Sequence, residues 1–241
     1  MRSVFRLFSP LALFVVLLLV SAVATAQRIE IEVPGGTSPV IDGTMSPGEW
    51  DNAVQLPMES TGTLFLMADD LYLFVAIHAG YQPVTNVYVV LDGLVNVLHA
   101  SAALGSAIYD LVDDQWIQTD SYLPYACRST RSSEESSYAL WERTTFFENE
   151  GWFASNVYMG TPSDLEYQIP WRAPMLPLAI ISMFANSDGL RTWLPADLDD
   201  DCWNRTLLYA DDVSPLLFQP ETWLQLVRSE APPEETQPRG L

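Results

Sequence analysis

Polar and apolar residues alternate along much of this chain, and this period of two limits the folds that it can adopt. Arg28 to Val33 reads Arg-Ile-Glu-Ile-Glu-Val, in which every second residue is apolar. Successive side chains of a β-strand point to opposite faces, so this pattern predicts a half-buried strand. Short runs rich in Val, Leu, Phe and Tyr predict further strands at 63–67, 71–78, 86–91, 152–158, 165–169, 178–184, 206–209 and 222–227.

The spacing of these runs predicts the fold class. Turn residues such as Asp69-Asp70 and Asp92-Gly93 separate short strands, which is typical of an all-β antiparallel sandwich with two sheets, of immunoglobulin-like architecture. One stretch is ambiguous. Within 97–115, four apolar residues fall at helical spacing and make this stretch the candidate for one short helix, although Gly105 disfavours it. Residues 129–137 are interpreted as a polar loop.

The two ends of the chain differ in composition from its middle. Residues 1–26 hold Arg2 and Arg6, then an apolar run, then small residues before Gln27, which is the pattern of a cleaved secretory signal peptide. An uncleaved N-terminal anchor is the alternative. Residues 229–241 are rich in Pro and Glu and are interpreted as a tail or linker. We therefore expect one folded domain over 27–228 of a secreted protein, with no membrane insertion after signal removal.

Charge narrows the choice of partners. The formal net charge is −20, and all 11 basic residues are arginines. A nucleic acid or an anionic membrane surface needs a basic face, so neither is expected as a partner. With 49% hydrophobic and 12% aromatic residues, the chain has enough apolar material for a folded core.

The two cysteines, Cys127 and Cys202, lie in polar, loop-like surroundings. In an exported chain such a pair predicts one disulfide bond, and two free thiols are the alternative. Neither cysteine lies in a Cys-x-x-Cys motif or beside a histidine, which argues against a zinc site.

Four sequence pieces, in order, carry a family resemblance. They are Pro39-Val40-Ile41-Asp42-Gly43 with Trp50, then Asp70-Leu71-Tyr72-Leu73 with a later strand ending in Leu91-Asp92, then Glu166-Tyr167-Gln168-Ile169-Pro170-Trp171, and last Trp193-Leu194-Pro195 with Trp203. Over roughly residues 37–210 the chain resembles the family 9 carbohydrate-binding modules and the related DOMON-like sandwiches, which bind sugar or haem. The resemblance implies a sandwich fold, and most of the matched residues have structural roles.

The resemblance also implies a sugar site. In these modules two loop aromatics clamp a sugar ring, and the equivalents here are Tyr81 and Trp203. Packing is the competing role for each of them. This chain departs from the family at Ala79-Gly80 and at Thr85–Tyr88, where many members have acidic residues. The expected sugar site therefore has fewer polar side chains to hydrogen-bond a ligand than it has in those members.

A run of acidic residues between Trp193 and Trp203 is a candidate metal site. Calcium prefers oxygen ligands, and Asp197, Asp199, Asp200 and Asp201 supply carboxylates in one loop. Family modules often carry structural calcium, and a solvated acidic loop is the alternative. A second, weaker cluster comprises Asp110, Asp113 and Asp114.

Some DOMON-like relatives bind haem b through Met, His or Lys, and this chain has no Lys. Ligation by two histidines would require His78 and His99 to meet across the sandwich, and it is disfavoured.

These observations lead to one functional hypothesis and two alternatives. No nucleophile-and-base motif is found, so we expect no enzyme activity. The leading hypothesis is a non-catalytic extracellular domain that holds a glycan with loop aromatics and contains structural calcium. One alternative is a secreted or cell-surface interaction domain, with a protein partner, that keeps the fold without binding sugar. The other is a haem b electron-transfer domain.

Overall fold

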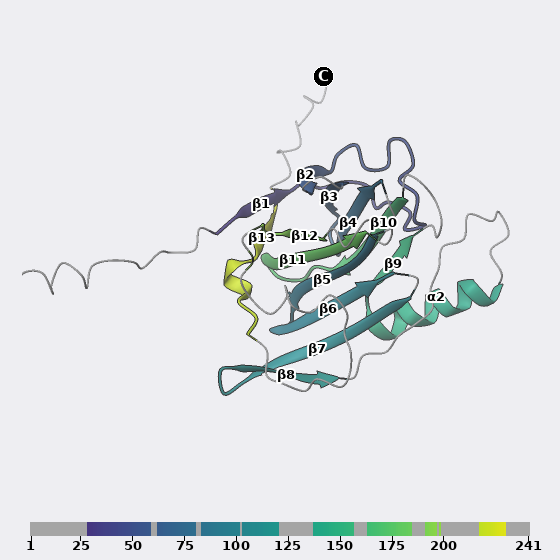
Figure 1. Cartoon of the computed structure of the whole chain (residues 1–241). Coiled ribbons are helices and arrows are strands. Elements are labelled where there is room, and N and C mark those ends of the chain that lie inside the picture. Colours follow the sequence, from purple (N-terminus) through teal and green to yellow (C-terminus); the bar gives the residue numbers. More distant parts are fainter. Residues whose placement is uncertain are drawn as a thin grey trace, which may run out of the picture.

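The computed structural model describes residues 28–58, 62–80, 83–101, 103–120, 137–156, 163–184, 191–196, 198 and 217–229. Within these residues the strands form two stacked sheets (Figure 1). In spatial order, the eight-stranded sheet comprises β1 (Glu30–Val33), β13 (Leu224–Arg228), β11 (Met175–Phe184), β5 (Pro83–Leu91), β6 (Leu94–Ala100), β7 (Leu104–Val112) and β8 (Gln115–Asp120), with β12 (Arg191–Leu194) also paired to β11. The five-stranded sheet comprises β2 (Val54–Met58), β3 (Gly62–Ala68), β4 (Tyr72–Ala79), β10 (Ser163–Pro170) and β9 (Phe153–Asn156).

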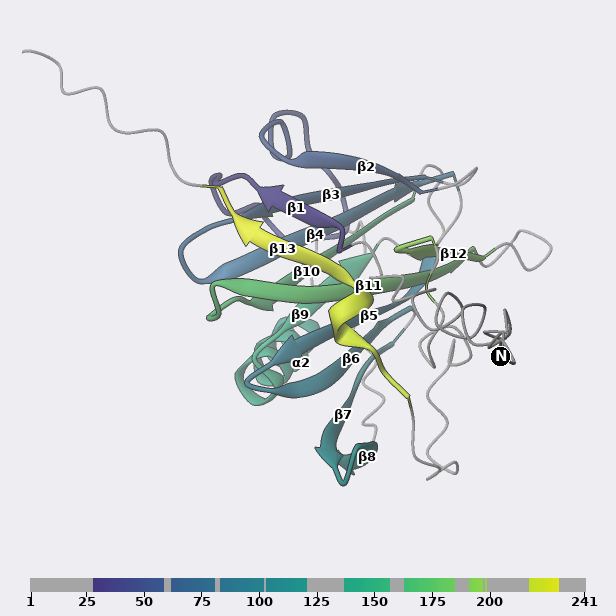
Figure 2. The ribbon, with the colours of Figure 1, turned by 90° about the vertical axis from the view of Figure 1, so that its left-hand side faces the viewer.

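The all-β sandwich predicted from the sequence is confirmed, with one difference in strand direction. β1 pairs with β13 in parallel, from Glu30 opposite Gln225 to Val33 opposite Arg228. Figure 2 shows these two strands side by side at the margin of the eight-stranded sheet. The other strand pairs of the described chain are antiparallel.

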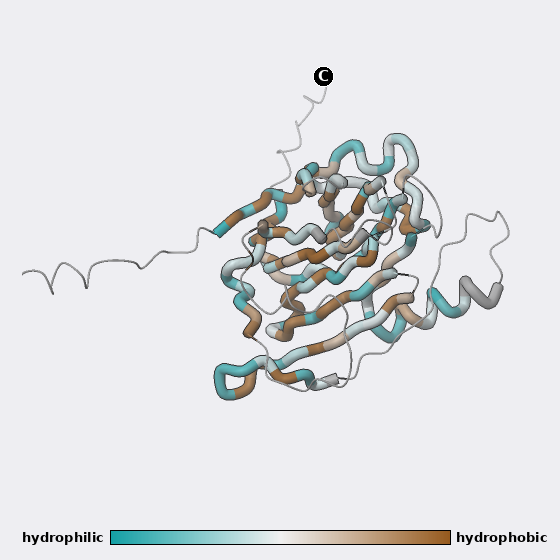
Figure 3. Tube along the Cα trace, in the orientation of Figure 1, coloured by the Kyte–Doolittle hydropathy of each residue, from teal (hydrophilic) through white to brown (hydrophobic). Residues whose placement is uncertain are grey.

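Hydrophobic residues are concentrated on the strands and hydrophilic residues in connections such as the β7–β8 turn (Figure 3). The main core lies between the sheets, where Leu73 and Val75 of β4 are fully buried. Phe74 and Ala76 of the same strand are buried on its other side, against Trp50. β4 is thus covered on both faces, as a continuous apolar run predicts.

The outer face of the eight-stranded sheet is also covered. A second apolar cluster there includes Tyr88, Tyr109, Trp116 and Trp223, and Phe218 packs against all four rings, at centroid distances of 5.1 to 6.3 Å. Phe218 precedes a short 3₁₀ turn, η1 (Pro220–Thr222), that leads into β13. In the described part of the chain, no helix is long and apolar enough to cross a membrane.

The helix expected within 97–115 is wrong, because this stretch forms most of β6, all of β7 and the start of β8. Leu104, Ile108 and Val112 are four residues apart, and an even spacing keeps side chains on one face of a strand as well as on one face of a helix. Asp113 and Asp114, at φ 50° and 60°, make the tight turn that reverses the chain into β8.

The helix of the described chain is α2 (Ser137–Glu150), where the sequence predicted a loop up to residue 137 and no element between 138 and 151. α2 packs against β9, beside the five-stranded sheet (Figure 1). Its Phe146 is buried in the main core, 5.2 Å from the ring of Trp152. It ends at Gly151, whose φ of 73° allows the backbone N–H to reach the carbonyl of Phe147 at 2.9 Å.

Candidate functional site

The residues predicted to hold a glycan, a calcium ion and a disulfide lie outside the described parts of the chain. They are Tyr81, Trp203, Asp197, Asp199, Asp200, Asp201, Cys127 and Cys202. Their neighbours are described. β4 ends just before residue 81, and β5 begins at Pro83, which pairs with Phe184. Leu198 is buried in the cluster on the outer face of the eight-stranded sheet. The assignments of these eight residues stay predictions.

At the end of the sandwich next to residue 81, the space between the sheets changes from aliphatic to polar. Thr85 and Ser182 continue the inward-facing rows of β5 and β11, and their hydroxyl oxygens are 2.8 Å apart. Ser163 and Asn156 stand at the same end of the five-stranded sheet, on the face that carries Leu165 and Ala154 in the core. Each of these four side chains is 2% exposed or less.

This polar end contains unpaired groups. The Asn156 amide nitrogen donates to the carbonyl of Ser101, which joins the two sheets. Within the described chain, the Asn156 side-chain carbonyl and the Ser163 hydroxyl have no hydrogen-bond partner. Most buried polar groups in proteins are paired, so the partners of this hydroxyl and this carbonyl lie outside the described protein atoms.

The two histidines belong to different sheets and to separate hydrogen-bond networks. His99 lies on the outer face of β6, where one ring nitrogen is 2.8 Å from the Asn86 amide oxygen and the other is 3.0 Å from the Ser101 hydroxyl. Burial lowers the pKa of His99 to about 4. His78, on β4, is 2.6 Å from a carboxylate oxygen of Asp164. In this geometry both ring nitrogens of His99 are already bonded.

Glu166 is the residue whose role sequence reasoning missed. It lies on β10 at 0% exposure and accepts hydrogen bonds from the backbone N–H groups of Asp42 and Gly43 and from the indole N–H of Trp50, at 3.1, 2.8 and 2.9 Å. Burial raises its pKa to about 7, although the bonds from Gly43 and Trp50 favour the charged form. Residues of the first and third sequence motifs are thus joined at one carboxyl group. Its hydrogen bonds hold loop 40–50 against the five-stranded sheet.

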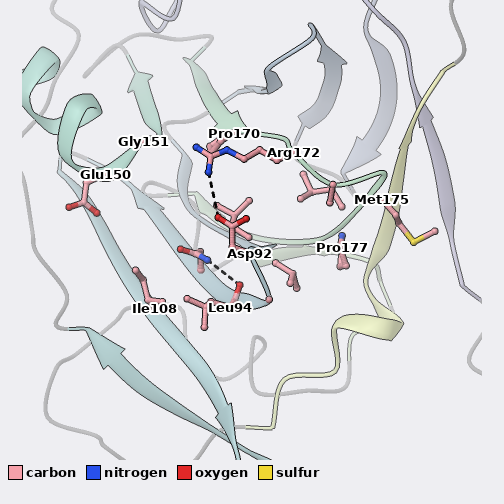
Figure 4. Close-up of a pocket in the computed structure, with 15 residues that line it drawn as sticks. Asp92, Leu94, Ile108, Glu150, Gly151, Pro170, Arg172, Met175 and Pro177 are labelled. Carbon is pink, nitrogen blue, oxygen red and sulfur yellow. Dashed lines mark hydrogen bonds and ion pairs between the residues drawn. The ribbon is translucent and has the colours of Figure 1, made fainter.

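A hollow of about 510 Å³ lies at the opposite end of the sandwich and is called the Asp92 hollow here (Figure 4). Its walls include Asp92, Leu94, Ile108, Glu150 and Arg172. Asp92 and Arg172 face each other across it, with a guanidinium nitrogen 3.6 Å from a carboxylate oxygen. The charged side chains stand at its rim over an aliphatic floor.

The described residues contain no cluster of three or more histidine, cysteine or acidic side chains that could hold a metal ion. Asp110, Asp113 and Asp114 are among these described residues. The weaker cluster predicted from the sequence is therefore not a metal site in this geometry, and two of its members instead form the β7–β8 turn.

Comparisons with known proteins add one finding. No protein-family model matches the chain, and no curated protein sequence matches it. A search of solved structures matches a family 9 carbohydrate-binding module from Caldicellulosiruptor kristjanssonii in complex with cellotriose. The match covers 89% of this chain and 100% of that chain, at 12% sequence identity and a TM-score of 0.43. Its family is the one that the sequence motifs resemble, but similarity this low carries no weight for the ligand.

Proposed function

We propose that this chain is a secreted, non-catalytic domain that binds a glycan at the end of the sandwich next to residue 81. The observation that carries the proposal is the polar end between the sheets. A sugar hydroxyl both donates and accepts hydrogen bonds, so sugar hydroxyls have the chemistry that the Ser163 hydroxyl and the Asn156 carbonyl require.

In this proposal Tyr81 and Trp203 stack on the apolar face of the sugar. The loop of Tyr81 follows Ala79, which pairs with Ser163, so it starts at the polar end. Trp203 is five residues beyond Leu198, which is fixed on the eight-stranded sheet.

The proposal also includes a calcium ion and a disulfide bond. Asp197, Asp199, Asp200 and Asp201 hold a structural calcium ion with carboxylate oxygens, as hard cations prefer. Support comes from buried Leu198, which anchors the backbone between the first two of these residues. Cys127 and Cys202 form a disulfide that joins this loop to the segment after β8.

The test is titration of the secreted chain with a panel of oligosaccharides and polysaccharides, including cellotriose, in millimolar calcium. Trp fluorescence reports binding. Removing a stacked aromatic by Tyr81→Ala or Trp203→Ala is expected to cost about 1–3 kcal/mol, by analogy with aromatic stacking on bases, which weakens Kd by about 5- to 150-fold. Chelating calcium with EDTA is expected to weaken binding in the same direction.

Trp141→Ala is the matched control, because Trp141 is 56% exposed on α2 and its loss removes an exposed indole elsewhere. Its Kd should equal that of the unchanged chain. The proposal fails if the folded, calcium-loaded protein binds no member of the panel, or if affinity survives both aromatic substitutions.

A second candidate function is an interaction domain without a sugar site, and a specific observation favours it. Thr85 and Asn86 are the polar residues of β5 nearest to Tyr81, and both are buried with internal partners, Ser182 and His99. They are therefore not available to a ligand. Absence of glycan binding in the titration would support this candidate.

A further inference from the structure

The eight-stranded sheet extends beyond the five-stranded one, and in the described part of the chain no strand lies opposite one portion of its inner face. β9 is the last strand of the smaller sheet, and the Trp152 indole N–H just before it donates to the Ser106 hydroxyl of β7 at 2.9 Å. β9 therefore faces β7 near Ser106, and the rest of β7 together with β8 extends past the smaller sheet. The Asp92 hollow adjoins this overhang at Ile108, beside the end of α2 and the turn after β10.

An aliphatic strip runs from the hollow along the overhang. Leu94 and Ile108 form its floor. Val112 is on the same face as Ile108, because the two are four residues apart on β7. Ile117 pairs with Asp110 and so shares that face as well. Val112 is 43% exposed and Ile117 is 37% exposed, so the strip is open to solvent at its outer part.

Carboxylates outnumber cations beside this strip. Asp92 and Glu150 stand at the rim of the hollow, and Asp110 lies between Ile108 and Val112 on the same face. Asp92 is fixed in a tight turn, with φ of 52°, followed by Gly93 at 85°. Arg172 offsets part of this charge through a long, solvent-exposed ion pair. Such a pair is weak, so it is readily exchanged for another cation.

We propose that the Asp92 hollow and the aliphatic strip together form a docking groove for a basic polypeptide segment of another protein. Aliphatic side chains of that segment pack on Leu94, Ile108 and Ile117, and its lysines or arginines pair with Asp92, Asp110 and Glu150. Among the described residues that line the hollow none is aromatic, so they offer no ring on which a sugar could stack. A second copy of this chain, with a net charge of −20, has the wrong charge for the groove.

The probe is a short synthetic peptide of alternating leucine and lysine, added to the ¹⁵N-labelled chain. The amide signals expected to shift are those of residues 92–96 and 108–117. Ile117→Thr keeps a β-branched residue and removes apolar surface, and Asp92→Asn with Glu150→Gln removes the rim charge. Each change is expected to weaken Kd about fivefold.

Matched controls are Ile29→Thr, at an isoleucine 39% exposed on the segment before β1, and Glu32→Gln on β1, and both should leave Kd unchanged. A serine–lysine peptide should bind at least about tenfold more weakly, since it lacks the aliphatic contact. Unchanged Kd in the groove variants, or equal binding of the serine–lysine peptide, would overturn the proposal. Displacement of the peptide by cellotriose would assign the hollow to a glycan instead.

Discussion

Glu166 shows how one buried side chain can hold a loop of this sandwich in place. Its carboxyl group replaces water for three N–H groups that would otherwise be buried without an acceptor. Asp164, two residues earlier on the same strand, accepts a fourth bond from the backbone of Met45 at 2.9 Å. The loop that carries the first sequence motif is therefore held by acceptors on β10 rather than by strand pairing.

Glu166→Ala is expected to lower the free energy of unfolding by about 3 kcal/mol or more, because it leaves buried donors unpaired and opens a cavity. Glu166→Gln keeps one side-chain acceptor and is expected to cost less. Urea denaturation followed by Trp fluorescence measures both. Glu32→Ala, at an exposed position on β1, is the control and should change stability by less than about 0.5 kcal/mol. Equal stability of Glu166→Ala and the control would show that the N–H groups find other acceptors.

At the level of elements, the sequence predicted strands better than helices. The runs at β3, β4, β10 and β13 were visible because apolar and β-branched residues repeat there between turn signals. β6 and β7 were not recognised, since apolar residues four positions apart fit either period. α2 was missed because helix-forming residues between Ser137 and Glu150 show no clear apolar face, and its best signal was the glycine that follows.

Gly151 allows a test of how the backbone conformation at the end of α2 affects stability. Gly151→Ala places a Cβ at φ 73° and is expected to destabilise the chain by about 1–2 kcal/mol, although no atom lies within 4 Å of the new carbon. Gly35 has the same open surroundings without a positive φ, so Gly35→Ala should have little effect. Thermal unfolding compares the two. If both variants melt at the same temperature, backbone conformation at the end of α2 does not limit stability.

The predicted site illustrates what a sequence can and cannot show. Tyr81 and Trp203 were chosen from a motif pattern, whereas the polar end between the sheets depends on residues from four strands. Thr85, Asn156, Ser163 and Ser182 are ordinary strand residues in the sequence, and their convergence is visible only from strand register.

At the scale of the whole molecule, two buried titratable groups oppose each other in the pH dependence of stability. Glu166 has a pKa raised from 4.5 to about 7, so its contribution is fully present below pH 4.5 and is lost as pH rises to 7. His99 has a pKa lowered from 6.5 to about 4, so its contribution is present above pH 6.5 and is lost as pH falls to 4. Between pH 4.5 and 6.5 the two slopes have opposite signs.

Replacing one of these two residues should reveal the pH dependence of stability that the other contributes. Relative to the unchanged chain, Glu166→Gln is expected to lose stability more steeply as pH falls from 6.5 to 4.5. His99→Gln is expected to gain stability over the same range. Melting temperatures at half-unit pH steps, with Glu32→Gln as a control that follows the unchanged chain, measure these differences. Parallel curves for all the variants would mean that neither group titrates differently in the folded and unfolded states.

The parallel pairing of β1 with β13 has a mechanical consequence. The chain enters β1 at Glu30 and leaves β13 at Arg228, and the register places these residues at opposite ends of the paired strands. A force that pulls the two ends of the domain apart therefore slides one strand along the other and loads their hydrogen bonds together rather than one at a time. A domain of this topology held between two attachment points would resist extension through these two short strands before the rest of the sandwich carried any load.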